Sequence, residues 1–347
     1  MKTFVTHLQG SRAGRLLGPH IAALAALVVM LLAVAPAGVM AQGQPGAVNP
    51  TANAVNEKQL LEALKPGQGI SGRASIPDAR ASRLEQPDGR VFREQRDATA
   101  RTGGLAILGM LGLLVVFYLV RGKVRISDGP SGRTVTRFGF VDRFAHWLTA
   151  TSFILLALTG LNITFGRSLL LPLIGPSAFT TLTEMGKFVH NYVSFAFVLG
   201  LVLMLLLWVK DNFPALRDVR WLLQGGGLIG LGHPPAGRFN AGQKLIFWSV
   251  ILVGGAISVT GYMLMFPFQF STTIFDMQWA NVWHGFLGLV LTAVIMAHIY
   301  IGSVGMEGAF DAMGSGEVDQ NWAREHHSIW AEKVIGKTGD GRPSPAE

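Results

Sequence analysis

From residue 103 onward, long apolar stretches alternate with more polar ones along the chain. Each apolar stretch is close to the ~20 residues that an α-helix needs to cross the hydrocarbon core of a bilayer. The pattern therefore predicts an all-α membrane protein with five spanning helices, at residues 103–120, 144–165, 187–209, 245–267 and 281–304.

The first 41 residues have a different pattern, that of a secretory signal peptide. Basic residues open the chain, an apolar run follows at 21–35, and small or aliphatic residues precede a cleavage position at Gln42. A retained anchor helix is the alternative, but the apolar run is short for a membrane span.

Residues 42–102 are polar, with Pro, Gly, Ala and Arg spread through them and little sustained periodicity. We expect a short helix at 56–64 and extended or loop structure at 75–91. Because the segment follows a signal peptide, it is predicted to be an exported arm that contacts a partner or is partly disordered.

The distribution of basic residues predicts the orientation of the spans. The loops at 121–143 and 210–244 are rich in Lys and Arg, whereas those at 166–186 and 268–280 hold a single Arg between them. Cytoplasmic loops carry the excess of basic residues in membrane proteins. The basic loops and the C-terminal tail are therefore expected in the cytoplasm, and the arm at 42–102 in the periplasm, outside the bacterial inner membrane.

Composition agrees with a membrane protein and narrows its chemistry. Half of the residues are hydrophobic, 14% are charged and the mean hydropathy is +0.38. The net charge of +8 is explained by the basic loops, so nucleic acid is not an expected partner and membrane lipid is. The chain has no cysteine, which excludes a disulfide, a cysteine-ligated iron–sulfur cluster and covalent c-type haem. Histidine is the obvious ligand for any redox metal.

The last predicted span carries two histidines, His284 and His298, fourteen residues apart. At ~100° and ~1.5 Å per residue, their side chains lie within about 40° on one helix face and about 21 Å apart along it. Ionisable groups inside a membrane helix are costly and usually functional. A lone buried histidine would more often be a hydrogen-bonded packing residue, but two on one face favour ligands.

The predicted topology divides the histidines by depth. His146 and His298 fall at the cytoplasmic ends of their spans, and His190 and His284 begin their spans on the outer side. A histidine pair on facing helices can hold a b-type haem without cysteine. The remaining histidines, which are His7 and His20 in the signal segment and His233, His326 and His327 in polar loop or tail, are expected to have no ligand role.

Small residues lie beside these histidines and would allow a flat macrocycle to approach the helix backbones. Ordinary packing of small residues between membrane helices is the alternative explanation. The glycines concerned are Gly160, Gly200, Gly285 and Gly288.

Two haems about 20 Å apart along the membrane normal would form an electron path. The chain has no nucleotide-binding fingerprint, no iron–sulfur ligands and no catalytic triad. The electron donor is therefore expected on another subunit.

Several short motifs resemble those of the gamma subunit of respiratory formate dehydrogenase, a cytochrome b, over roughly 135–333. The motifs are Asp142-Arg143-Phe144-Ala145-His146-Trp147, Arg238-Phe239-Asn240-Ala241-Gly242-Gln243-Lys244, Trp283-His284-Gly285, Ala297-His298-Ile299-Tyr300 and Trp322-Ala323-Arg324-Glu325-His326-His327. The resemblance implies a four-helix bundle that holds two b haems, with axial ligands at His146, His190, His284 and His298. It also implies an iron–sulfur subunit and a catalytic subunit with molybdenum or tungsten as partners.

The resemblance further implies a quinone site beside the cytoplasmic haem, at Asn240, Gly242 and Gln243. The two amides can hydrogen-bond a quinone carbonyl, and glycine permits close approach of a ring. The alternative is that Asn240 only caps the following helix.

The signal peptide, arm and first span have no counterpart in that family. The resulting organisation is a signal peptide at 1–41, a periplasmic arm at 42–102, an extra transmembrane helix at 103–120, a cytoplasmic linker at 121–143, a di-haem domain at 144–306 and a cytoplasmic tail at 307–347.

Two other functions remain open. The chain could serve as the cytochrome b subunit of a hydrogenase or of a thiosulfate or polysulfide reductase, which changes only the electron donor. It could instead be a haem-free membrane anchor or transporter whose histidines relay protons. The asparagine–glutamine segment and the paired histidines of the tail favour the formate version.

Overall fold

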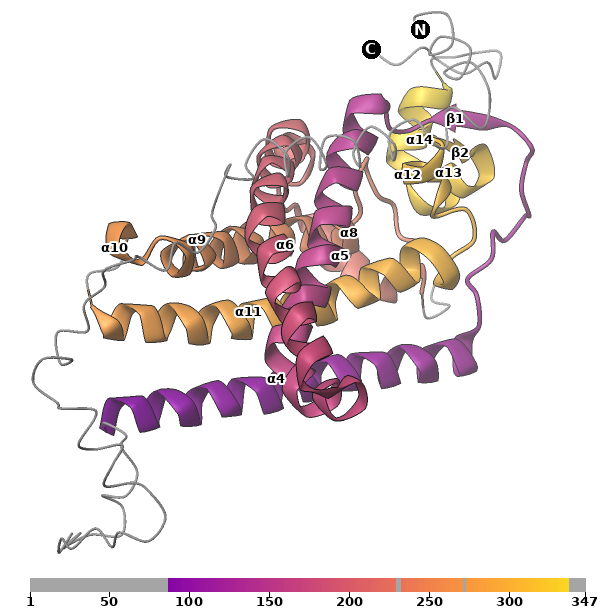
Figure 1. Ribbon diagram of the computed structural model, residues 1–347. Helices are drawn as coiled ribbons and strands as arrows, with labels where there is room; N and C mark the ends of the chain where they lie inside the picture. Colours follow the sequence, from indigo (N-terminus) through magenta and orange to yellow (C-terminus); the bar gives the residue numbers. More distant parts are fainter. Residues whose placement is uncertain (1–86, 229–231, 271–272, 337–347) are drawn as a thin grey trace, which may run out of the picture. The chain divides into compact units, whose positions relative to one another are not determined.

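The computed structural model describes residues 87–228, 232–270 and 273–336 (Figure 1). The predicted signal peptide at 1–41, the predicted short helix at 56–64 and most of the arm at 42–102 lie outside these residues. Contacts divide the chain into two compact units, and the fold described here is that of the unit which contains Phe92–Glu347.

Five helices are long and apolar enough to cross a membrane, as the sequence predicts. One of them is built from α8 and α9, which are joined by a π-helical turn at Ser249–Val253. The helices are α4 (Pro87–Arg121), α5 (Phe140–Leu169), α6 (Leu171–Trp208), α8 (Ala241–Trp248) with α9 (Gly254–Met265), and α11 (Ile274–Tyr300).

Two of these helices begin well before the predicted spans. Helix α4 begins at Pro87, so the end of the stretch predicted to be extended is helical. Helix α6 begins at Leu171, where a loop is predicted, and bends at Gly175, whose φ of 79° is followed by a proline. A turn of this kind needs a glycine because other residues rarely adopt positive φ. Hydropathy marks only the membrane-crossing part of a helix, which explains both differences.

The helices of the predicted di-haem domain pack as two antiparallel pairs, α5 with α6 and α9 with α11 (Figure 1). Helix α11 also contacts α5, which links the pairs. Gly200 of α6 allows the closest approach to α5: a Cβ atom at this position would lie 3.1 Å from the Thr149 Cα atom.

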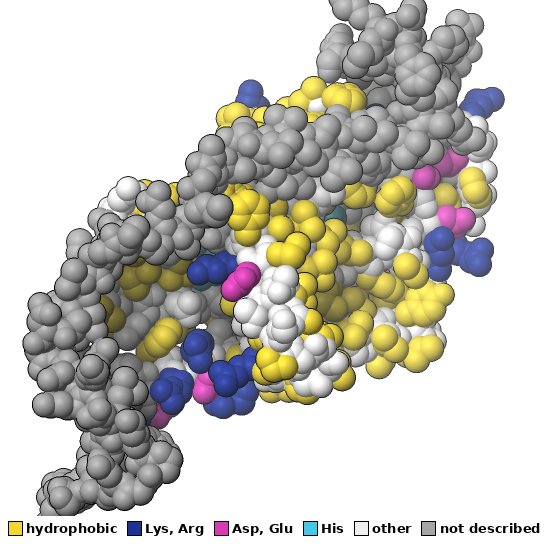
Figure 2. Space-filling model, in the orientation of Figure 1, with side chains coloured by type: hydrophobic (Ala, Val, Ile, Leu, Met, Phe, Trp, Pro, Cys, Tyr) yellow, Lys and Arg dark blue, Asp and Glu magenta, His cyan; other side chains and the backbone are white. Residues whose placement is uncertain are grey.

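Large apolar side chains face outward along the long helices. On α4, Leu119 and Val120 are 77% and 84% exposed. Figure 2 shows hydrophobic side chains spread over the described face, with charged side chains in small groups. Apolar surfaces of this kind suit contact with lipid. The helices can lie in lipid because their backbone hydrogen bonds are satisfied internally.

The remaining elements are short. The described residues include a two-stranded antiparallel sheet, in which β1 (Thr134–Thr136) pairs with β2 (Glu317–Asp319), so the fold is not purely helical. The short helices are α7 (Leu216–Leu223), α10 (Pro267–Phe270), α12 (Asp311–Gly314), α13 (Gln320–His326) and α14 (Ser328–Ile335), with a π-helical turn at Ile301–Gly305 after α11.

Arg137, just after β1, holds the C-terminal segment in place. Its Nη2 atom donates to the Arg238 carbonyl oxygen at 2.7 Å and contacts His327 Nε2 at 3.0 Å. Its guanidinium lies over the Trp322 and Trp330 rings, 5.2 Å from each centroid. Burial, and then the charge of Arg238, lower the pKa of Arg137 to about 9, so it remains charged at neutral pH.

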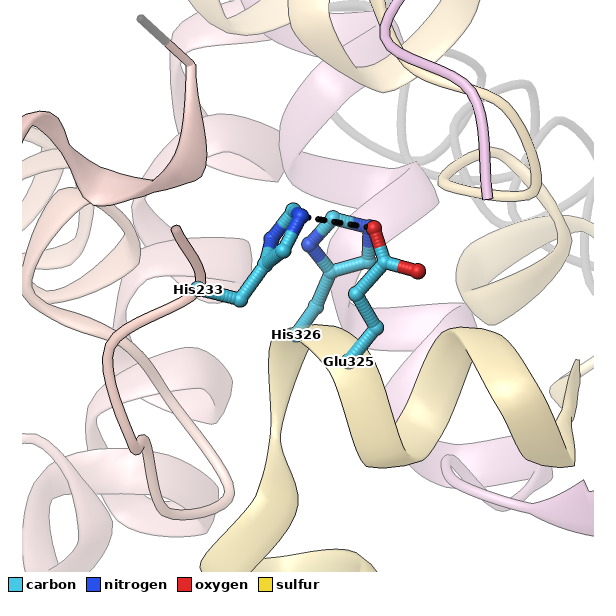
Figure 3. A group of neighbouring side chains, drawn as sticks. All are labelled: His233, Glu325 and His326. Carbon is cyan, nitrogen blue, oxygen red and sulfur yellow. Dashed lines mark ion pairs between the residues drawn. The ribbon is translucent and has the colours of Figure 1, made fainter. Parts of the chain in front are cut away.

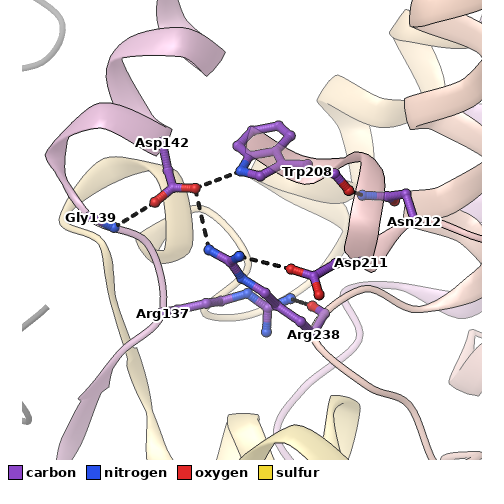
Figure 4. A network of polar contacts seen from close by, with 7 residues as sticks. All are labelled: Arg137, Gly139, Asp142, Trp208, Asp211, Asn212 and Arg238. Carbon is purple, nitrogen blue, oxygen red and sulfur yellow. Dashed lines mark hydrogen bonds and ion pairs between the residues drawn. The ribbon is translucent and has the colours of Figure 1, made fainter. Parts of the chain in front are cut away.

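A second polar network joins the start of α5 to the end of α6 (Figure 4). Asp142 accepts hydrogen bonds from Trp208 Nε1 at 2.6 Å and from the Gly139 amide at 3.2 Å. Arg238 bridges Asp142 and Asp211, at 3.3 Å and 2.9 Å. The network therefore fixes the segment before α8 against two spanning helices.

The close contact at Gly200 predicts a packing defect in Gly200→Ala. The new methyl group would push against Thr149, and overpacking of this kind costs about 1–3 kcal/mol. Gly109→Ala on α4 is the matched control, since no described atom from outside the helix backbone lies within 4 Å of a Cβ there. Thermal unfolding in detergent, followed by circular dichroism, should show a lower midpoint for Gly200→Ala alone; equal midpoints would contradict the packing.

Candidate functional site

The structure brings four histidines from three spanning helices into two facing pairs. His146 of α5 faces His298 of α11, with ring centroids 6.1 Å apart. His190 of α6 faces His284 of α11, with ring centroids 6.0 Å apart. These are the pairs that the sequence analysis derives from depth.

Two of the four lie elsewhere in their helices than the sequence analysis expects. His190 and His284 were expected to begin their spans, but α6 begins at Leu171 and α11 at Ile274. Both histidines therefore lie well inside their helices. His298 lies close to the end of α11, as expected.

The distance within each pair matches one metal atom between two imidazoles. Two metal–nitrogen bonds of about 2 Å, plus about 1 Å from each nitrogen to its ring centre, give centroids about 6 Å apart. A direct hydrogen bond of about 2.9 Å between the two rings would bring the centroids to roughly 5 Å. The observed separations of 6.1 and 6.0 Å fit the first arrangement.

Hydrogen bonds set the tautomer of the second pair. The His284 Nδ1 atom lies 3.0 Å from the Ile257 carbonyl oxygen, which can only accept, so Nδ1 carries the proton. The His190 Nδ1 atom lies 2.8 Å from Thr159 Oγ1, whose own hydrogen is donated to the Leu155 carbonyl oxygen. In both rings Nε2 is then the unprotonated nitrogen, the form that binds a metal.

Glycines give these rings room. A Cβ atom at Gly261 would lie 3.0 Å from His284 Cε1, and one at Gly160 would lie 3.5 Å from His190 Cε1. Gly160 therefore lies beside a histidine ring, as predicted. Gly261 is a further glycine beside such a ring. The other predicted glycines differ: Gly200 packs against Thr149, Gly285 lies near Thr99, and no described atom lies within 4 Å of a Cβ at Gly288.

A cavity of about 530 Å³ borders the first pair. His146 and His298 line it together with Asn240, Gly242 and Gln243, the residues predicted to bind quinone. Its volume is in the range of small-molecule sites, and apolar residues make up most of its lining.

Asn240 and Gln243 also form a capping box at the start of α8. Asn240 Oδ1 accepts from the Gln243 amide at 2.9 Å, and Gln243 Oε1 accepts from the Asn240 amide at 3.1 Å. The capping alternative is therefore present in the structure. Toward the described residues these side chains use only their oxygens, so each side-chain NH₂ group can still donate to a molecule in the cavity.

Three histidines for which the sequence predicts no ligand role also line this cavity. His233, His326 and His327 all line it, and the last two are 7% and 1% exposed. His327 supports the fold, because its Nδ1 contacts the Gly237 carbonyl oxygen at 2.8 Å and its Nε2 contacts Arg137. Burial, and then Arg137, lower its pKa well below the usual value. The prediction of a polar loop and tail missed this burial.

Facing histidine pairs inside apolar helices are the arrangement of a membrane cytochrome b. Comparison with known proteins agrees. The model of the family described as prokaryotic cytochrome b561 matches residues 137–316, slightly more than half of the chain.

The similar proteins are subunits of formate dehydrogenases. The cytochrome b556 subunit of the nitrate-inducible formate dehydrogenase of Escherichia coli K12 is 30% identical over 208 residues, which cover 58% of this chain and 92% of that protein. A second formate dehydrogenase cytochrome b556 subunit of the same strain is 28% identical, with 58% and 93% covered. The corresponding subunit of Haemophilus influenzae is 26% identical, with 62% and 89% covered.

The chain therefore belongs to the prokaryotic cytochrome b561 family, and within it to the formate dehydrogenase cytochrome b subunits that these relatives represent. It is an integral membrane protein, and membership implies haem b. The paired imidazoles, their separations and the glycines beside them fit that group.

Thr159 should matter to the second pair because it orients His190. In Thr159→Val the acceptor for the His190 Nδ1 proton is lost. Removing a group that orients a metal-binding histidine typically weakens binding about 10–100-fold. Thr164→Val is the control, since Thr164 lies on the same helix and its hydroxyl donates to the Gly160 carbonyl oxygen of its own helix. Haem content of the purified protein, measured as pyridine haemochrome, should fall in Thr159→Val; unchanged content in both variants would contradict the orienting role.

Proposed function

We propose that this chain is the membrane subunit that carries electrons from a formate-oxidising complex to the quinone pool, through two b haems. The observation that carries the proposal is that two facing histidine pairs share one helix, α11. His284 and His298 of α11 each face a histidine of another helix, at 6.0 and 6.1 Å between ring centroids.

The four histidines are the proposed axial ligands, His146 with His298 and His190 with His284. Bound haem supplies one-electron transfer, and the protein's part is to hold the two groups at a set distance. Since α11 is one continuous helix over these residues, the spacing of its two histidines is about 21 Å along the helix axis.

The partners follow from what the chain lacks and from its relatives. It contains no cysteine to bind an iron–sulfur cluster, and its relatives are named as subunits of formate dehydrogenases. Formate oxidation is thus assigned to a molybdenum- or tungsten-containing catalytic subunit, with an iron–sulfur subunit between it and this chain.

The charge pattern supports an orientation in the bacterial inner membrane. The basic loops at 121–143 and 210–244 and the tail from residue 307 are assigned to the cytoplasm. The arm at 42–102 is assigned to the periplasm, after a signal peptide at 1–41. The His190/His284 pair is then the outer one, next to the partner subunits.

Protease accessibility tests this orientation. Protease added to intact spheroplasts should cut within 42–102 and spare the loop at 210–244, because the arm is exposed outside and that loop is not. Cleavage should reach the loop once the membrane is permeabilised. The opposite pattern in intact cells would overturn the orientation.

Single histidine substitutions test the ligands. His190→Ala should remove the outer haem and leave the inner haem with its own absorption and midpoint potential, because the pairs use different helices α5 and α6. His146→Ala should do the reverse. Asn281→Ala, an exposed residue on α11 outside both pairs, is the control and should keep both haems. Full haem content in both alanine variants would contradict the assignment.

Quinone is proposed to bind in the cavity beside His146 and His298. Asn240 and Gln243 would donate side-chain N–H groups to a quinone carbonyl, while their oxygens keep the capping box. Quinone reduction takes up two protons per molecule. Uptake from the cytoplasm, with formate releasing protons outside, would store energy across the membrane.

The capping box allows a clean test of this site. Asn240→Ser and Gln243→Glu keep acceptors that suit the cap but remove the amide N–H groups. Formate should still reduce the haems in both variants, while electron transfer to quinone slows by about tenfold, the cost of ~1.4 kcal/mol in one lost hydrogen bond. Asn281→Ser on α11, an exposed asparagine, is the control. Normal quinone reduction in both cavity variants would rule out the site.

A further inference from the structure

Three side chains outside the two histidine pairs converge at the edge of the cavity (Figure 3). His233 comes from the segment before α8, and Glu325 and His326 come from α13. One ligand atom from each lies within 4.8 Å of the other two. The cluster therefore joins two segments that are about ninety residues apart in sequence.

The contacts within this cluster leave one imidazole without a hydrogen bond. Glu325 Oε1 lies 2.7 Å from His233 Nε2, an ion pair or hydrogen bond. His326 Nε2 lies 3.9 Å from the same oxygen, which is too far for a hydrogen bond. No hydrogen bond links the His326 ring to the part of the chain that the structure describes, although its side chain is only 5% exposed. The His326 ring lines the cavity, where a ligand could supply the missing partner.

Packing holds the rings in this arrangement. The His326 ring lies tilted against Trp322, with centroids 5.2 Å apart, and meets the His233 ring edge-on at 4.9 Å. The carboxylate is fixed from the other side by Ser127, whose amide donates to Glu325 Oε2 at 2.9 Å and whose hydroxyl contacts Oε1 at 3.2 Å. Contacts of this kind are typical of the groups that orient metal ligands.

We propose that His233, Glu325 and His326 bind a zinc ion. Two histidines and one glutamate are a common zinc ligand set, with a fourth position for water. Bonds of about 2 Å in tetrahedral geometry place ligand atoms about 3.3 Å apart. The distances of 2.7 and 3.9 Å from Glu325 Oε1 lie on either side of that value, so small side-chain movements suffice.

The bound ion would satisfy the His326 nitrogen and fasten the segment before α8 to the C-terminal helices. That segment leads directly to Asn240, so the zinc site would brace one wall of the cavity. The site is independent of the haem proposal, because it shares no residue with the histidine pairs. The competing explanation is a metal-free ion pair between His233 and Glu325.

Metal binding to the purified complex distinguishes the two explanations. The complex is stripped with a chelator, titrated with zinc and washed, and its zinc is then counted by elemental mass spectrometry. The wild-type complex should take up one more zinc per chain than Glu325→Gln, His233→Gln or His326→Gln. Glu332→Gln, an exposed glutamate on α14, should bind like the wild type. Zinc K-edge absorption should show two imidazoles and one carboxylate in the wild type.

Two results would overturn the zinc site. One is a stripped wild-type complex that takes up no zinc at micromolar concentrations, which favours the ion pair and requires no variant to fold. The other is equal zinc uptake by the wild type and all three ligand variants. Haem content, measured in the same samples, shows separately whether the haem assignment holds.

Discussion

An imidazole buried among apolar helices needs a polar partner for each ring nitrogen, because an unsatisfied polar group there is costly. His190 and His284 meet half of this need through Thr159 and the Ile257 carbonyl oxygen. In each ring Nε2 is the nitrogen that remains to bind a metal. Gly160 and Gly261 leave room for the His190 and His284 rings, and the continuous helix α11 sets the distance between this pair and the His146/His298 pair.

The two pairs have different surroundings, which suits different roles. The His190/His284 pair lies among helix backbones and hydroxyl groups. The His146/His298 pair borders a cavity whose wall also includes amide, histidine and carboxylate side chains. Arg137 and Asp142 position that wall by joining the C-terminal segment and the residues before α8 to the spanning helices. The polar side chains in this wall suit the proposed binding of a diffusible acceptor beside the His146/His298 pair.

Features that depend on the local sequence pattern can be predicted from the sequence. Features that depend on contacts between residues far apart in the sequence cannot. Hydropathy predicts all five long helices. The depth of each histidine within its own span predicts the two facing pairs. Both predictions use only positions along individual helices. The pairing of β1 with β2 brings together strands of three residues that lie far apart in sequence, and such short strands leave no periodic signal. The burial of His326 and His327 likewise depends on Arg137 and on the His233 ring, which lie far from them in sequence.

Reduction of the haems by formate is the decisive measurement for the proposed electron path. The complex would be purified with its partner subunits, kept free of oxygen and quinone, and mixed with formate while the absorption spectrum is recorded. The account predicts that formate reduces two b haems per chain of this subunit, to the same extent as dithionite. Haems that dithionite reduces but formate leaves oxidised, or a single haem per chain, would contradict it.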